Sequence, residues 1–235
     1  MTDWDNIDAG EIAKFESMAA YWWDTNGVLK SLHDINPLRL KYIDDRSPLY
    51  AKRVLDVGCG GGILAEAMAR KGARVKGIDM AEGPLQAARD HAAWGGFEIG
   101  YRQSTAEAFS RKHANEFDIV TCFELLEHVE NPTSIVAACA RLVRPGGDVF
   151  FATLDRNLIA GLFAIIGAEY VLRLIARGTH QYRRFVKATE LKHLAGEAGL
   201  TCRNLTWMNY NPFTKRYFLG KTGRVNYLIH FTKSF

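Results

Sequence analysis

The chain contains 235 residues, of which 48% are hydrophobic and 24% are charged, and its formal net charge at pH 7 is +4. These values are typical of a globular α/β protein and exclude fibrous and disordered classes. The charge is mild and the basic residues are dispersed, so we expect no nucleic-acid partner. Four cysteines without a C-x-x-C pair, and an acidic N-terminus without an apolar signal core, predict a cytoplasmic protein with reduced thiols.

The first 48 residues are expected to form a helical cap. Residues 10–23 predict an amphipathic helix with Ile12, Phe15 and Ala19 on one face. A second helix is expected to begin near Asn36, with Asn36 as its N-cap and Pro37 at the first helical position. Both helices precede a glycine-rich turn, and we expect them to pack over a ligand site formed there.

The segment Val54–Gly62 (V-L-D-V-G-C-G-G-G) predicts a strand, a tight turn and a helix N-terminus. Glycines let a nucleotide-like ligand approach the backbone, and helix N–H groups point at it. A dinucleotide fingerprint, G-x-G-x-x-G, would need glycine where the chain has Ile63, which argues against a nicotinamide-dependent oxidoreductase. The G-x-G-x-G turn resembles that of class I S-adenosylmethionine (SAM)-dependent methyltransferases. A turn that only packs strand against helix is the remaining interpretation.

The predicted second strand, at 74–78, is followed by Asp79, which lies 21 residues after Gly58. A carboxylate at this strand end has two acceptor oxygens, which suit the two hydroxyls of a ribose. The alternatives are a solvated loop acid or the N-cap of the next helix.

Alternating strands and helices predict a parallel sheet with helices on both faces, whose ligands bind at the carboxyl ends of the strands. The expected strands are 53–57, 74–78, 98–102, 117–122 and 147–153. Two later strands, 201–208 and 225–232, would form an antiparallel hairpin and complete a mostly parallel, seven-stranded Rossmann-like sheet. We assign residues 1–235 to one domain, with its core at 49–157 and 185–235.

Residues 123–129 (F-E-L-L-E-H-V) follow the fourth predicted strand and are expected to begin a helix at the ligand edge. On that helix Glu124 would share a face with Glu127 and His128. Methyl transfer to a phenolic oxygen needs a base, and we expect His128 or Glu127 in that role, oriented by Glu124. The same three residues could instead bind Mg²⁺ or another divalent metal. A third interpretation is that the acids only stabilise the helix N-terminus.

The insertion at 158–184 is apolar in its first half and rich in arginine in its second half. Its apolar run is too short to span a bilayer, which needs about 20 apolar residues. An apolar segment beside arginines is typical of contact with an anionic membrane surface. A helical lid over the active site is the alternative interpretation, and one segment could serve as both.

A series of short motifs narrows the family. In order they are E-I-A-K-F (11–15), W-W-D (22–24), N-P-L-R (36–39), the glycine turn, E-L-L-E-H (124–128), G-A-E-Y (167–170), G-T-H (178–180) and Y-N-P (210–212). Together they resemble the ubiquinone-biosynthesis O-methyltransferases, from about residue 10 to the end of the chain. The glycine turn is common to many methyltransferases, whereas N-P-L-R, G-A-E-Y and Y-N-P are more specific.

The resemblance implies a cofactor, substrates and a location. SAM is the implied methyl donor, and polyprenylated catechol and demethylubiquinol intermediates are the implied acceptors. A cytoplasmic enzyme at the inner face of the cytoplasmic membrane, among other ubiquinone-biosynthesis proteins, would meet such lipids. The implied cofactor-binding residues are Arg39, Gly58, Gly60, Asp79, Met80, Ala106 and Phe123. A methionine is common at the position of Phe123, and phenylalanine keeps an apolar wall there.

Overall fold

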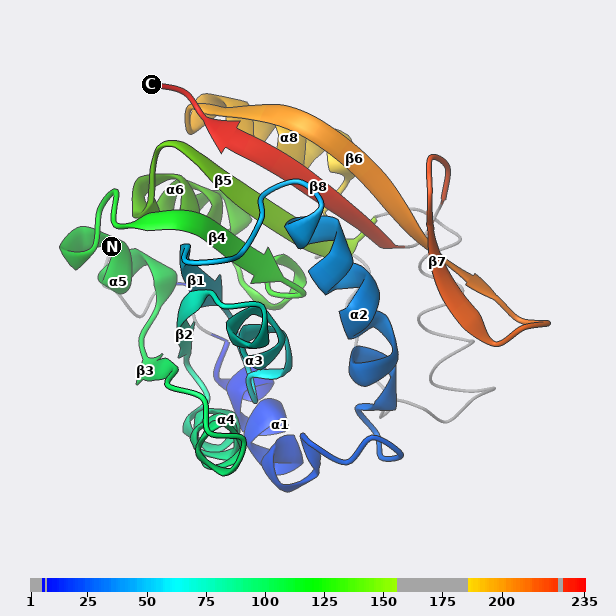
Figure 1. Ribbon diagram of the computed structural model, residues 1–235. Coiled ribbons are helices and arrows are strands. Elements are labelled where there is room, and N and C mark those ends of the chain that lie inside the picture. Colours follow the sequence, from blue (N-terminus) through cyan, green and yellow to red (C-terminus); the bar gives the residue numbers. More distant parts are fainter. Residues whose placement is uncertain (1–5, 7, 156–185, 224–225) are drawn as a thin grey trace.

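A computed structural model of the chain describes residue 6 and residues 8–155, 186–223 and 226–235 (Figure 1). The insertion predicted at 158–184 lies outside the described residues. The strands are β1 (Arg53–Val57), β2 (Arg74–Asp79), β3 (Gly100–Gln103), β4 (Phe117–Phe123), β5 (Val143–Leu154), β6 (Leu200–Asn211), β7 (Arg216–Gly220) and β8 (Asn226–Lys233). The helices are α1 (Ala9–Met18), η1 (Ala19–Tyr21), α2 (Lys30–Asp44), α3 (Ile63–Arg70), α4 (Glu82–Trp94), α5 (Ala106–Lys112), η2 (Leu126–His128), α6 (Pro132–Leu142) and α8 (Ala188–Glu197).

The described strands form one sheet in the order β3-β2-β1-β4-β5-β8-β6-β7. Neighbouring strands from β3 to β5 run parallel, and β8, β6 and β7 are added by antiparallel pairing. The predicted Rossmann-like α/β architecture is confirmed, but the described residues contribute eight strands to the sheet rather than the predicted seven. The additional strand is β7, which pairs with the end of β6 and forms the outer edge.

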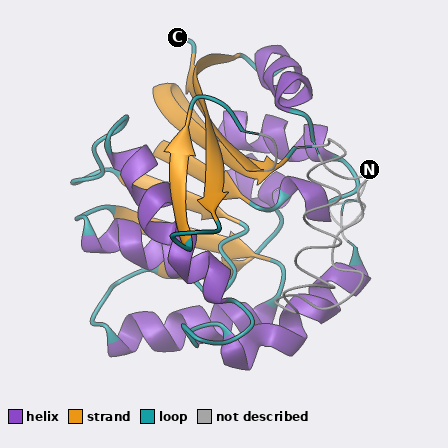
Figure 2. Ribbon diagram, turned by 90° about the vertical axis from the view of Figure 1, so that its right-hand side faces the viewer, coloured by secondary structure: helices purple, strands orange, loops and turns teal. Residues whose placement is uncertain are grey.

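Helices cover both faces of the sheet because successive strand residues point to opposite sides (Figure 2). On one face Leu55, Val120 and Phe151 pack in a cluster with residues of α5, α6 and α8. Their neighbours pack on the other face with residues of α2 and α3; these neighbours are Val54, Ile119 and Phe150. Strands buried on both faces explain the continuous apolar runs in the sequence.

Two helix boundaries differ from the prediction. The second helix begins at Lys30, so Asn36 is not its N-cap and Pro37 lies inside it. Ile35 is buried in the core cluster, and Asn36 Nδ2 donates a hydrogen bond to the Ile63 carbonyl at 3.2 Å. These tertiary contacts outweigh the local cost of an internal proline. The first helix ends at Met18 and continues as a 3-10 turn.

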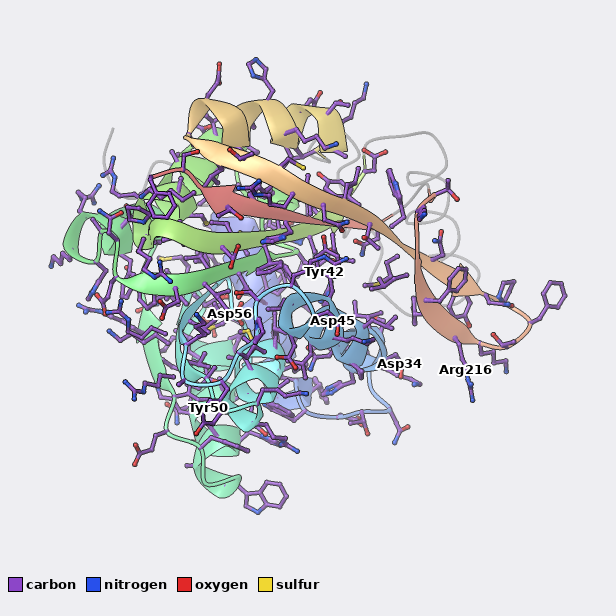
Figure 3. All side chains as sticks on the ribbon, turned by 45° about the horizontal axis from the view of Figure 1, so that its top comes forward. Asp34, Tyr42, Asp45, Tyr50, Asp56 and Arg216 are labelled. Atoms are coloured by element: carbon purple, nitrogen blue, oxygen red, sulfur yellow. The ribbon has the colours of Figure 1, made fainter. Side chains whose placement is uncertain are left out.

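Two polar residues, Tyr42 and Asp56, are buried inside the fold (Figure 3). Tyr42 on α2 is fully buried, and its hydroxyl donates to Asn204 Oδ1 at 2.9 Å. Asp56 at the end of β1 accepts a hydrogen bond from Thr121 Oγ1 at 2.7 Å, and burial raises its pKa to about 7. Asp56 therefore joins β1 to β4 beneath the glycine turn.

Asp148 on β5 accepts hydrogen bonds from His230, Ser47 and Thr232 at 2.8, 2.8 and 3.1 Å. Burial raises the pKa of Asp148, but these donors outweigh burial and hold the pKa below its usual value. Such a group stabilises the fold above its unfolded pKa of about 3.9, and the contribution is lost as pH falls through the folded value. We expect Asp148→Asn to cost about 2 kcal/mol at pH 7 and much less near pH 2, measured by urea unfolding. An equal cost at both pH values would contradict this.

Candidate active site

The glycine turn between β1 and α3 is joined directly to the acid at the end of β2. Gly58 and Gly60 have φ angles of 71° and 50°, a backbone conformation that residues other than glycine rarely adopt. The N–H groups of Gly58 and Cys59 donate to the Ile78 carbonyl at 2.8 and 3.1 Å. The Gly60 N–H donates to Asp79 Oδ2 at 2.9 Å. The structure thus brings Gly58, Gly60 and Asp79 together at one edge of the sheet.

Asp79 also accepts a hydrogen bond from the Ala81 N–H, at 2.9 Å through Oδ1. Burial raises the pKa of this carboxyl, against the opposing effect of its backbone donors. The N-cap of α4 is Ala81, so Asp79 does not serve as the cap of that helix. The other two residues expected here lie nearby: the Met80 carbonyl accepts from Gln103, and Ala106 is buried at the start of α5.

Trp22 and Trp23 cover the glycine turn, and the sequence prediction of site residues missed both. A Cβ atom at Gly60 or Gly61 would lie 2.2 or 2.1 Å from the Trp22 ring, so these glycines permit close packing of the indole. Trp23 Nε1 donates to the Gly61 carbonyl at 3.0 Å. The W-W-D motif could have indicated this contact. Two adjacent indole rings after an amphipathic helix bury a large area when they pack against a neighbouring surface.

Arg39 extends from α2 toward the end of β4. Its side chain is buried, one terminal nitrogen contacts the Glu124 carboxylate, and its guanidinium lies 5.5 Å from the centre of the Phe123 ring. Arg39 Nε is buried and has no hydrogen-bond partner among the described residues. A buried, unsatisfied N–H is costly, so this donor points to a missing acceptor. Arg39, Glu124 and Phe123 therefore form a second part of the site.

Glu124 is not on a helix, contrary to the prediction for residues 123–129. Its φ angle is 53°, its N–H donates to the Ala152 carbonyl at 2.8 Å, and the following helical turn covers only Leu126–His128. The strained backbone is held by contacts of the side chain, which also accepts from Asn226 Nδ2 at 3.2 Å. Burial alone would raise the pKa of Glu124, but the Arg39 charge together with the hydrogen bonds from Glu127 and Asn226 outweighs burial and holds the pKa below its usual value.

Glu127 is buried and accepts a hydrogen bond from Thr153 Oγ1 at 2.7 Å. Burial, followed by the charge of Glu124, raises the pKa of Glu127 well above its ordinary value. Two neighbouring carboxyls whose pKa values shift in opposite directions lose their protons one after the other rather than together. Glu124 is therefore ionised, and Glu127 holds its proton more tightly.

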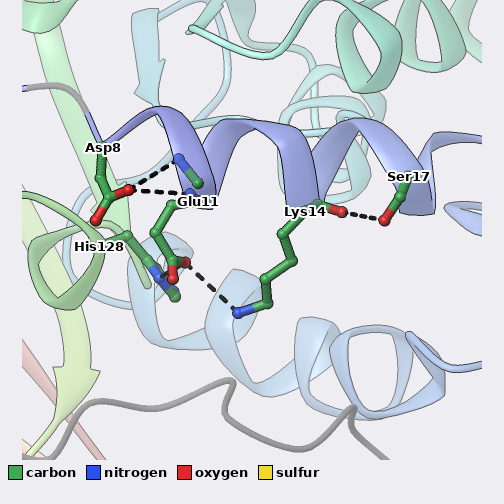
Figure 4. Close-up of polar contacts among 6 residues, drawn as sticks. Asp8, Glu11, Lys14, Ser17 and His128 are labelled. Atoms are coloured by element: carbon green, nitrogen blue, oxygen red, sulfur yellow. Dashed lines mark hydrogen bonds and ion pairs between the residues drawn. The ribbon is translucent and has the colours of Figure 1, made fainter.

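His128 is held by a residue of the N-terminal helix. Its Nδ1 lies 2.7 Å from Glu11 Oε2 (Figure 4). The His128 ring also meets the Phe15 ring edge-on at a centroid distance of 5.2 Å. The hydrogen bond with His128 lowers the pKa of Glu11, more than burial raises it, so this carboxylate is ionised and acts as the acceptor. The expected orientation of His128 by Glu124 is replaced by a pairing with Glu11. Glu11 stands in the E-I-A-K-F motif, but no local spacing links it to position 128.

The three residues named as metal ligands are thus directed to separate partners: Arg39 and Asn226, Thr153, and Glu11. Across the described part of the chain, no group of three or more His, Cys, Asp or Glu side chains is arranged to hold a metal ion. Within the same residues, no helix has both the length and the apolar character needed to cross a membrane.

Known structures share this architecture. A SAM-dependent methyltransferase of Thermotoga maritima, described as a possible histamine N-methyltransferase, aligns with a TM-score of 0.69 at 16% identity, covering 95% of this chain and 99% of that one. Magnesium protoporphyrin IX methyltransferase of Synechocystis with bound SAM aligns with a TM-score of 0.62 at 17% identity, over 89% and 85% of the two chains. At these identities the likeness shows the fold alone.

Sequence relatives narrow the family further. Residues 32–205 match the methyltransferase domain family. The ubiquinone biosynthesis O-methyltransferase of Thiobacillus denitrificans is 56% identical over 224 residues, which cover 95% of this chain and 97% of that protein. Its counterpart in Saccharophagus degradans is 52% identical over 229 residues, covering 97% of both chains. With a Rossmann-like sheet, a glycine turn joined to Asp79 and this identity over nearly its full length, the chain belongs to the ubiquinone biosynthesis O-methyltransferase family of SAM-dependent methyltransferases.

Proposed function

We propose that this protein transfers a methyl group from SAM to ring hydroxyls of polyprenylated catechol and demethylubiquinol intermediates. The observation that carries the proposal is the 56% identity to a ubiquinone biosynthesis O-methyltransferase, over 95% of this chain. The same relationship argues against a nicotinamide-dependent oxidoreductase. A methyltransferase of another small aromatic substrate is the alternative, and the choice between them depends on the acceptor.

The residues at the sheet edge fit SAM. The unsatisfied Arg39 Nε–H is a charged donor suited to the carboxylate of the methionine part. Asp79 offers acceptors at the position where a ribose diol is bound in related folds, beside the Gly58–Gly60 turn. Met80, Ala106 and Phe123 would line the remainder of that site. When bound, SAM supplies an activated methyl group on its sulfonium.

We assign the general base to His128. The ionised Glu11 accepts a hydrogen bond from Nδ1–H, which fixes the ring orientation and, in the neutral imidazole, makes Nε2 the unprotonated nitrogen. Nε2 then removes the proton of the acceptor hydroxyl as its oxygen becomes nucleophilic, a contribution of about 10²–10⁴-fold. Glu127 serves less well as a base, because burial and the nearby Glu124 charge raise its pKa and so favour its protonated form. Glu124 positions Arg39 in this scheme.

Because the proposed substrates are lipids, we propose that the enzyme works in the cytoplasm at the inner face of the membrane. The segment 158–184 and other proteins of the pathway are the candidates for holding it there. A divalent metal at Glu124, Glu127 and His128 would require these side chains to leave their present partners. Their separate hydrogen bonds favour direct base catalysis instead.

A methyl-transfer assay with a short-chain prenyl catechol, run with and without a chelator, tests the proposal. We expect turnover that depends on SAM and persists with chelator, because base and orienting carboxylate are already in contact. Loss of turnover with chelator, restored by Mg²⁺, would contradict the metal-free mechanism. Absence of turnover on prenyl catechols, together with methylation of an unprenylated phenol, would favour the alternative substrate class.

A further inference from the structure

The β6–β7 hairpin tip, residues 210–218, projects from the body of the molecule beyond the other strands (Figure 1). Phe213, at its turn, is 96% exposed, and Tyr210 and Phe218 are each 48% exposed. The turn is ordered by Asn211, whose Oδ1 accepts from the N–H groups of Phe213 and Thr214 at 2.9 and 3.2 Å. A large apolar ring is therefore presented to solvent by a defined backbone.

The charged residues of the hairpin itself are all positive. Lys215, Arg216 and Lys221 lie on or beside β7, and residues 207–223 contain no Asp or Glu. No carboxylate within the described residues is paired with these three cations, and Arg216 points away from the sheet (Figure 3). Cations on an edge strand also discourage pairing with another sheet. That role accounts for the charges but not for an almost fully exposed phenylalanine.

The hairpin is continuous with the active site. Met208 on β6 is paired with Asn226 on β8, and Asn226 donates to Glu124 at 3.2 Å. Phe213 lies five positions after Met208, in the turn that follows the end of β6 at Asn211, so the two residues are at most roughly 17 Å apart at the rise of a β-strand. A surface that contacted the tip would therefore lie on the same hairpin that pairs with Asn226, the partner of Glu124.

We propose that the β6–β7 hairpin tip docks on an anionic phospholipid bilayer, with Phe213 inserted among the lipids and Lys215 and Arg216 on their headgroups. The apolar ring gains from leaving water, and each cation gains from the negative surface potential. The proposal rests on the proposed function, because a polyprenylated acceptor resides in the membrane and the enzyme must bind it there. It adds a contact site outside the segment 158–184.

Co-sedimentation with vesicles tests this contact, using phosphatidylcholine with and without phosphatidylglycerol. We expect the wild-type protein to bind the anionic vesicles. The Phe213→Ser variant should bind about tenfold more weakly, and the double variant Lys215→Gln/Arg216→Gln roughly 30-fold more weakly. Matched controls are Trp94→Ser, an 84% exposed aromatic on α4, and Lys112→Gln/Lys192→Gln, which removes two exposed charges elsewhere. The controls should bind like wild type.

Wild-type binding by both hairpin variants would overturn the proposal and assign the contact elsewhere on the chain. Failure of the wild-type protein to bind anionic vesicles would also overturn it. If Phe213→Ser changed the mass of the protein in solution but not its vesicle binding, the tip would contact a second copy instead. Turnover of a water-soluble prenyl catechol, measured in parallel, should be equal in wild type and hairpin variants. Its absence in the wild type would reject the proposed function and leave the vesicle result standing.

Discussion

Replacing His128 with alanine is expected to lower kcat by about 10²–10⁴-fold while SAM binds as it does to the wild-type protein. The reason is geometric: Glu11 and Phe15 of α1 hold the imidazole in one orientation, and no described contact links the ring to the glycine turn. The measurement is single-turnover methyl transfer to a short-chain prenyl catechol, with SAM affinity obtained by calorimetry. Full activity of His128→Ala would show that another group removes the proton.

The control for His128 is a second histidine with a similar partner. His113 Nδ1 lies 2.5 Å from Glu116 Oε2 at the end of α5, and His113→Ala should leave kcat unchanged. Glu11→Gln tests the orienting carboxylate in the same assay. We expect it to lower kcat, leave SAM affinity unchanged and have no further effect when combined with His128→Ala, because residues that act as one unit are not additive. Additive losses would instead indicate that Glu11 only stabilises the cap.

Replacing Arg39 with methionine is expected to weaken SAM binding by about 10–100-fold and to destabilise the fold by about 3 kcal/mol. Binding weakens because the substitution removes the unsatisfied Nε–H and the positive charge beside Phe123. Stability falls because Glu124 loses the cation that compensates its burial. Calorimetry with SAM and urea unfolding measure the two effects separately.

Two variants separate these effects. Adding Glu124→Gln to Arg39→Met removes the uncompensated charge, so it should recover part of the stability without recovering SAM affinity. Arg46→Met is the matched control, because Arg46 also lies near α2, where it stacks on Tyr42 at 3.8 Å and donates to Asn204. It should lower stability without changing SAM affinity. Unchanged SAM affinity in Arg39→Met would reject its role at the cofactor.

The fold was largely predictable from local patterns. The continuous apolar runs of β1 and β4 and the glycine turn before Ile63 require only neighbouring residues to be recognised, and the structure has them where the sequence predicts. The expected strand at 201–208 was found, but β7 was missed, because an edge strand with exposed aromatics and cations lacks the alternation of a half-buried one.

The sequence by itself determined the Rossmann-like sheet, the family and the grouping of Gly58, Gly60 and Asp79, because parallel strands bring their carboxyl ends to one edge. Only the tertiary structure decided the partners of the reactive side chains. Glu124 lies outside the helix that was predicted for it, because its contacts with Arg39 and Ala152 hold it in a positive-φ conformation. Glu11 and His128 are 117 positions apart in the sequence, and the packing of α1 in the folded chain brings their side chains into contact. Such pairings depend on the packing of distant elements, which no local spacing encodes.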